Sequence, residues 1–225
     1  MMKKILLLVT ALALTIGATA QDKPFTYGLK AGLNLSQISS GTMKYMGERY
    51  DLDASDMLVG FFVSAHFNYS FGQFFGIQPE LSFSMQGSKE TGTMDVGLDM
   101  SYSSTVRLNY INIPILFEVK PITNLSIFVG PQIGFNFYKS MTEKGGIDRF
   151  ISGSDFDDYL EQGGRKLNSF DFAAVVGLQY AILGKYLISA RYNIGLTSVV
   201  GSDTDGLSIS GGANRVLQFG IGYQF

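Results

Sequence analysis

Residues 25–36 read Phe25-Thr26-Tyr27-Gly28-Leu29-Lys30-Ala31-Gly32-Leu33-Asn34-Leu35-Ser36, with an apolar side chain at every second position. Successive side chains of a β-strand point to opposite faces, so this segment predicts a strand with one wholly apolar face. The other face carries small and polar side chains, among them Lys30 and Asn34. Such a strand fits a soluble β-sandwich and a membrane barrel equally well.

The same alternation returns in seven further segments. They occupy residues 57–69, 77–86, 106–119, 126–136, 170–179, 188–196 and 217–225. Segments of roughly ten residues match a tilted membrane strand better than a soluble strand, which usually has about five or six. Beyond the N-terminal twenty residues no apolar run has the length of a membrane-spanning helix. If this chain enters a membrane, it must therefore do so as a closed barrel.

The connections between these segments alternate in length. Four are long, at residues 38–56, 87–104, 139–168 and 198–214, and three are short, at 70–74, 120–124 and 181–185. Bacterial outer-membrane barrels have short periplasmic turns and long extracellular loops. We therefore expect an all-β fold, an eight-stranded antiparallel up-and-down transmembrane β-barrel with its apolar face toward lipid. A soluble ligand-binding barrel with the apolar face inside is the alternative.

One segment breaks the alternation. In residues 106–119, Val106, Leu108 and Tyr110 have the opposite parity to Ile111, Ile113, Ile115, Phe117 and Val119. A β-bulge near residues 110–112 would restore a single apolar face, because a bulge adds one residue to a strand. Alternatively, the strand leaves the membrane above Ile111, where the direction of a side chain no longer matters.

The N-terminus has the layout of a cleaved secretory signal. Lys3 and Lys4 precede an apolar run, and Ala18-Thr19-Ala20 precedes Gln21. We expect residues 1–20 to be the signal peptide and residues 21–225 to be the barrel domain. The chain has no cysteine, which excludes disulfides and thiolate metal sites. Its net charge of −2 argues against a nucleic-acid partner.

The C-terminal octapeptide resembles the insertion signal of outer-membrane barrels, carried here by Gln218, Gly220, Tyr223 and Phe225. The mature chain also resembles the PorT-type outer-membrane β-barrel proteins of the Bacteroidota. The motifs that carry this resemblance are residues 28–34, 78–81, 110–114, 130–132 and 191–196. The resemblance implies an outer-membrane location and contact with the barrel insertion machinery. Members include a component linked to protein secretion, but these motifs identify architecture rather than chemistry.

Charged side chains on the polar faces are the main candidate site. An eight-stranded barrel is just wide enough for side chains, so these groups should meet inside it. They are Lys30, Glu80, Glu118, Asp171 and Arg191. An unpaired buried charge costs several kcal/mol, so we expect a paired network that plugs the lumen. A proton or ion path is the alternative.

His66, the only histidine, should also face the lumen. A hydrolase would need a nucleophile and an acid beside it, and Ser82 or Ser84 with Glu80 could supply them. No catalytic motif surrounds these residues, so a hydrogen-bonded lumen histidine is the simpler expectation. We expect no catalysis and no cofactor.

The long connections carry aspartates in pairs that calcium loops also use, at Asp51, Asp53 and Asp56, at Asp155, Asp157 and Asp158, and at Asp203 and Asp205 before Gly206. The closing Glu of a calcium loop is missing, so surface solvation is the expected role. The functional hypothesis is a monomeric membrane anchor whose long loops, especially residues 139–168, contact an envelope or extracellular protein. A lipid-modifying membrane enzyme and a narrow channel are the alternatives.

Overall fold

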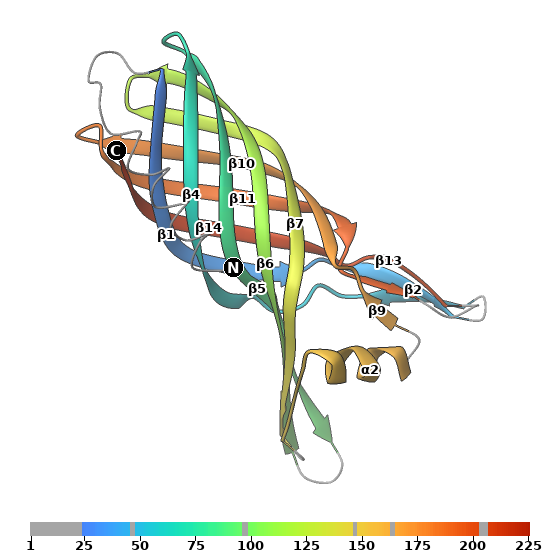
Figure 1. Ribbon diagram of the computed structural model, residues 1–225. Helices are drawn as coiled ribbons and strands as arrows, with labels where there is room; N and C mark the ends of the chain where they lie inside the picture. The colour runs from blue at the N-terminus through green and yellow to red at the C-terminus, as the bar shows by residue number, and fades with distance from the viewer. Residues whose placement is uncertain (1–23, 46–47, 96–98, 146–147, 163–164, 203–206) are drawn as a thin grey trace, which may run out of the picture.

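The computed structural model describes residues 24–45, 48–95, 99–145, 148–162, 165–202 and 207–225 (Figure 1). The predicted signal peptide lies outside these ranges. Eight long strands form a closed antiparallel ring, and the last of them pairs with the first. They are β1 (Phe25–Ile38), β4 (Leu58–Phe71), β5 (Phe75–Asp95), β6 (Asp99–Ile122), β7 (Leu125–Lys144), β10 (Phe170–Ile182), β11 (Tyr186–Ser198) and β14 (Ala213–Gln224). The predicted eight-stranded up-and-down barrel is confirmed.

Exposure alternates along the strands as the sequence pattern predicts. On β1, Leu29 is 54% exposed, whereas the next residue, Lys30, is 2% exposed. The exposed side chains of the wall are mostly Leu, Ile, Val, Phe and Tyr. Most of the buried polar side chains lie on the inner surface. The apolar face is therefore outside, which is the arrangement of a barrel that faces hydrocarbon and excludes the soluble barrel with an apolar interior.

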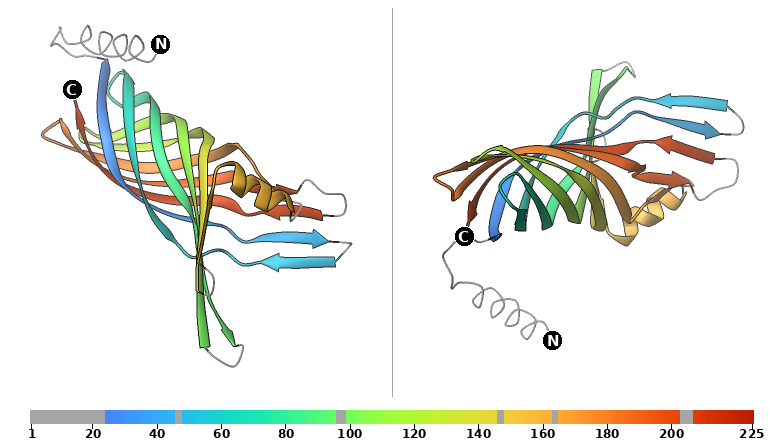
Figure 2. Two further views of the ribbon diagram at one scale, coloured as in Figure 1. Left: turned by 60° about the horizontal axis from the view of Figure 1, so that its bottom comes forward. Right: turned by 90° about the horizontal axis from the view of Figure 1, so that it is seen from above.

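The long connections project from one end of the barrel, called here the outer end, and the short turns lie at the other, the turn end (Figures 1 and 2). The turn between β10 and β11 places Leu183 at a φ of 52° and Gly184 at 68°. Left-handed backbone of this kind is used in tight strand connections. The described chain ends of β1 and β14 also lie at the turn end, where Phe225 N–H donates to the Tyr27 carbonyl oxygen.

The long connections contain regular structure that the sequence did not predict. The hairpin of β5 and β6 continues in register from Ser88 and Val106 to the pair Asp95 and Asp99, well beyond the barrel wall. A separate sheet consists of β2 (Gly41–Tyr45), β3 (Glu48–Leu52) and β13 (Leu207–Gly211). The connection after β7 contains β8 (Arg149–Ser152), α2 (Ser154–Gln162) and β9 (Arg165–Leu167), and β9 pairs with β12 (Val200–Ser202). No helix in the described ranges is long and apolar enough to cross a membrane.

The prediction of a bulge in residues 110–112 is wrong, because the bulge lies in the neighbouring strand β7. Pairing of β5 with β6 keeps one register from Phe75 and Val119 to Asp95 and Asp99, so β6 contains no added residue at positions 110–112. The register shift lies in β7, where Asn109 faces Tyr138 but Tyr110 faces Asn136, which leaves Phe137 as the extra residue. Leu108 and Tyr110 therefore stay on the inner face of β6, and both are buried.

Candidate functional site

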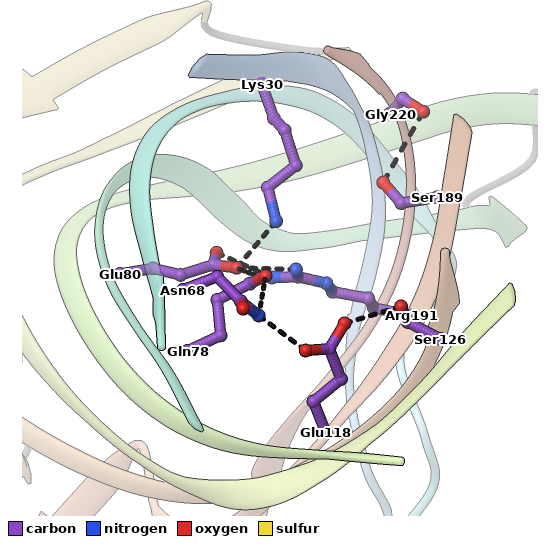
Figure 3. Close-up of polar contacts among 9 residues, drawn as sticks. All are labelled: Lys30, Asn68, Gln78, Glu80, Glu118, Ser126, Ser189, Arg191 and Gly220. Carbon is purple, nitrogen blue, oxygen red and sulfur yellow. Dashed lines mark hydrogen bonds and ion pairs between the residues drawn. The ribbon is translucent and has the colours of Figure 1, made fainter. Parts of the chain in front are cut away.

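Glu80 on β5 is the centre of the polar interior of the barrel (Figure 3). Its Oε1 atom accepts hydrogen bonds from Lys30 Nζ at 2.6 Å, from Arg191 Nη2 at 2.6 Å and from Gln78 Nε2 at 2.5 Å. Its Oε2 atom accepts one from Arg191 Nη1 at 2.7 Å. The Arg191 guanidinium thus forms a bidentate pair with both oxygens, which is the strongest geometry for an arginine and a carboxylate. Strands β1, β5 and β11 are joined across the lumen by these contacts.

Glu118 lies in a second polar group nearer the turn end. Its carboxylate accepts hydrogen bonds from Asn68 Nδ2 at 2.6 Å and from Ser126 Oγ at 2.5 Å. Lys120 Nζ lies 3.3 Å from the same carboxylate and is the more exposed partner of that pair. Asn68 also donates to Gln78 at 3.3 Å, so Gln78 connects this group to Glu80.

Asp171 stands apart from both groups, near the outer end. It accepts hydrogen bonds from Thr197 Oγ1 at 2.8 Å and from Asn214 Nδ2 at 2.9 Å. The same Asn214 amide lies 3.2 Å from the Tyr110 hydroxyl. In the described ranges no ion pair joins Asp171 or Glu118 to Lys30 or Arg191. The five charges share the lumen, but only Lys30, Glu80 and Arg191 contact one another.

His66 is fully buried opposite Glu80 in the register of β4 and β5, but neither of its ring nitrogens has a hydrogen-bond partner among the described residues. This differs from the expected hydrogen-bonded histidine. The ring lies against the backbone of Gly28, where an added Cβ would lie 2.8 Å from Nε2. Ser84 accepts from Asn34, and Ser82 donates to the Phe83 carbonyl oxygen. The described contacts therefore contain no serine–histidine pair.

Apolar side chains share the lumen with these polar groups, which the sequence reasoning missed. Leu116, Phe128 and Val175 form a buried cluster from β6, β7 and β10. The Arg191 guanidinium carbon lies 5.6 Å from the centre of the Phe128 ring, which is a cation–π distance. The missed signal was in the sequence, because Leu116 and Phe128 have the same parity as Glu118 and Ser126.

A larger apolar cluster lies at the outer end, named here the outer cap. Its buried members are Leu108, Tyr110, Phe156, Leu167 and Val199. Phe156 comes from α2, which sits over the outer end of the barrel beside β7 and β9 (Figure 2). Lys139 of β7 and Asp157 of α2 also form an ion pair. The inward parity of Leu108 and Tyr110 is thus explained, because the connection folded onto the rim buries them.

The C-terminal residues lie at the seam where β14 meets β1. Gln218 donates to the Asn34 side-chain oxygen at 2.8 Å. An added Cβ at Gly220 would lie 2.7 Å from the Phe62 ring, so glycine leaves room for that ring in the lumen. At the turn end, the Phe225 ring stacks on Tyr27 at 5.2 Å and meets Tyr223 edge-on at 5.0 Å.

The aspartates of the long connections do not form a metal site in the part of the chain that is described, where no group of three potential ligands is found. Asp51 pairs with Arg49 at 3.2 Å, and Asp56 accepts a hydrogen bond from Thr91 at 2.8 Å. Asp155 and Asp158 lie exposed on α2. Asp203, Asp205 and Gly206 lie outside the described residues.

One comparison with known proteins, the match to a family model, agrees with this architecture. The family model for an outer membrane protein beta-barrel domain matches residues 19–201. No curated protein matches the sequence. Among solved structures, Neisserial surface protein A is 13% identical with a TM-score of 0.45, over 90% of this chain and 98% of that one. Ail, the attachment invasion locus protein of Yersinia pestis, is 15% identical with a TM-score of 0.43, over 89% and 98%. OprG of Pseudomonas aeruginosa is 13% identical with a TM-score of 0.43, over 89% and 95%.

Proposed function

Since this chain belongs to the family of outer-membrane β-barrel domain proteins and lies in the bacterial outer membrane, we propose that it is a closed, non-conducting anchor. In this proposal the barrel holds a folded platform at the cell surface, and the platform binds a protein partner. The barrel itself does no chemistry, carries no cofactor and works as a monomer in outer-membrane lipid.

The contact between Glu80, Lys30 and Arg191 carries the proposal. These side chains meet in the middle of a ring of eight strands, whose interior is only wide enough for side chains. The apolar outer cap lies across the outer end, and the Glu118 group fills the lumen toward the turn end. A lumen occupied in three successive layers supports a plug better than it supports a water-filled path.

The platform is the second support. The β5–β6 hairpin, the sheet of β13, β2 and β3, and the segment containing α2 all project from the outer end (Figure 2). Because these strands are hydrogen-bonded to one another, they need less ordering on binding a partner than irregular loops do. We place this platform outside the cell, because long connections of outer-membrane barrels are extracellular.

Three finer points belong to the same proposal. Residues 1–20 act as the cleaved signal and residues 21–225 as the barrel domain. Gln218, Gly220, Tyr223 and Phe225 act as the signal for the insertion machinery. The chain is, in this proposal, a PorT-type barrel of the Bacteroidota, which the motifs at residues 28–34 and 191–196 support.

Two measurements test the proposal. In planar-bilayer recordings, the purified full-length mature barrel should show no stable conductance, and a large, steady one would contradict the plug. On intact cells, a photo-cross-linking residue at Tyr159, on α2, should capture a surface partner. The same residue at Leu183, in a short turn and 84% exposed, is the matched control and should capture none. Capture at Leu183 alone would contradict the extracellular platform.

A further inference from the structure

A cleft of about 590 Å³ opens between two projecting elements of the platform. On one side lie β2, β3 and the segment that follows β3, and on the other lie β5 and β6, which diverge from the outer end of the barrel (Figure 2). Its volume falls within the roughly 300–1,000 Å³ range of protein ligand sites. Its wall contains apolar side chains as well, including Met43, Leu52 and Tyr102.

The charged side chains that line this cleft in the described chain are all negative. Four carboxylates line it, from Asp51, Asp53, Asp56 and Glu90, and no lysine or arginine is among the described residues that line it. Asp51 is paired with Arg49, and Asp56 accepts from Thr91. Asp53 and Glu90 are exposed, and neither has an ion-pair partner in the described chain. The cleft therefore favours a cationic ligand.

The backbone of β5 adds a second feature that is independent of charge. Lys89 exchanges two hydrogen bonds with Asp56, donating at 3.3 Å and accepting at 2.8 Å, so its backbone groups point away from β6 toward the cleft side. Strand geometry repeats every two residues, so the N–H and C=O of Thr91 point to the same side. No described strand pairs with β5 there beyond Lys89. A free strand edge is a template for an added strand.

We propose that this cleft binds an extended basic segment of another protein, which pairs as a strand with the free edge of β5 near Thr91. The basic side chains of the segment meet Asp53 and Glu90, and its backbone continues the hydrogen bonding that Asp56 begins at Lys89. Backbone pairing supplies affinity in such complexes, while charge supplies selectivity. The inference deepens the proposed function and rests on it, because it names the chemistry of the partner.

The test uses the full-length mature barrel in nanodiscs and a fluorescent six-residue peptide of alternating arginine and threonine, with binding followed by anisotropy. The D53N/E90Q variant should bind about tenfold more weakly, because two exposed ion pairs are lost. The D158N/E161Q variant removes the same charge from α2, away from the cleft, and should bind like the wild type. Equal affinity of the wild type and D53N/E90Q would overturn the proposal.

Strand pairing is tested separately. Thr91→Pro removes an N–H that faces the free edge, so it should abolish binding without breaking the β5–β6 ladder. Thr91→Val keeps the backbone N–H and replaces the hydroxyl that donates to Asp56 with a methyl group, so this variant should retain binding. A peptide N-methylated at alternate residues tests the same hydrogen bonds without any change to the barrel, and it should not bind. Full binding of that peptide would overturn the strand model, even if Thr91→Pro fails to fold.

Two further outcomes separate this inference from the proposed function. Saturable Ca²⁺ binding that D53N/E90Q loses, with no peptide binding, would assign the cleft to a cation and overturn the proposal. Surface cross-linking at Tyr159 with no peptide binding would overturn the role proposed for the cleft but would still support the anchor function.

Discussion

Arg191 and Glu80 stand 111 positions apart in the chain and form two parallel hydrogen bonds inside the barrel, of 2.7 and 2.6 Å. Their strands, β11 and β5, are not neighbours in the ring. The contact therefore crosses the lumen and ties opposite parts of the wall together.

Replacing Arg191 by Ala should destabilise the barrel by about 3–5 kcal/mol, because Glu80 loses both hydrogen bonds from the guanidinium and a large buried side chain is removed from the lumen. Urea unfolding in lipid vesicles, followed by the change in gel mobility on heating, measures this free energy. Arg49→Ala removes an exposed ion pair and should change nothing measurable. An apolar triple variant, K30M/E80M/R191M, should be more stable than Arg191→Ala alone. Equal stability of Arg191→Ala and the wild type would contradict a paired network.

Single cysteines placed along β1 and β4 should react with a membrane-restricted probe at every second position. Leu29, Leu33 and Phe67 are 54%, 57% and 42% exposed, so cysteines there should be labelled. Cysteines at Lys30, Asn34 and His66 should not, because these positions are buried in the lumen. Labelling without a period of two, or with the reversed period, would show that the apolar face does not meet lipid.

Removal of Phe225 should impair insertion far more than shortening the β5–β6 hairpin beyond residue 90. The terminal residue donates its N–H to Tyr27 and stacks on the Tyr27 ring, so its loss weakens the seam between β14 and β1. The hairpin tip takes no part in that seam. The amount of heat-modifiable protein in the membrane fraction is the readout. Wild-type amounts of the truncated form would refute the prediction.

Phe156→Ala should loosen α2 without unfolding the barrel. Phe156 is 2% exposed in the outer cap, and a buried Phe-to-Ala change costs about 3–5 kcal/mol. Amide hydrogen exchange should speed up in residues 154–162 and stay slow in the strand pairs of the wall. Tyr159→Ala, on the same helix, removes a side chain that is 38% exposed and lies 5.7 Å from the Arg149 guanidinium, and it should change exchange little. Faster exchange throughout the wall strands would place Phe156 in the barrel core instead.

The barrel wall could be predicted because its signal is local. Leu29 and Lys30 are neighbours in the chain, and the period of two alone assigns them to opposite faces. The break in the alternation at Tyr110 is visible in the sequence, but its cause is not local. Phe156, from another connection, buries that part of β6. The pattern predicts a bulge in residues 110–112, whereas the added residue is Phe137 in the partner strand.

The contacts inside the lumen were harder to predict than its composition. Parity selects the inward residues, but which of them meet depends on the stagger of eight strands, which no single segment encodes. Thus Lys30 and Arg191 reach Glu80, whereas Asp171 finds Thr197 and Asn214. The polar hairpin of β5 and β6 was predicted as a loop for a related reason. With neither face buried in a core, its residues carry no hydrophobic alternation.

The cross-lumen contact of Lys30, Glu80 and Arg191 also constrains the order of assembly. Lys30 lies on the first strand of the wall and Arg191 on the seventh, so the cluster is complete only when the ring is nearly closed. An open sheet lying in the bilayer would turn these three charges toward hydrocarbon, which is strongly unfavourable. Closure of the ring and entry into the bilayer must therefore proceed together. A partly assembled, open sheet is not a stable intermediate in the membrane.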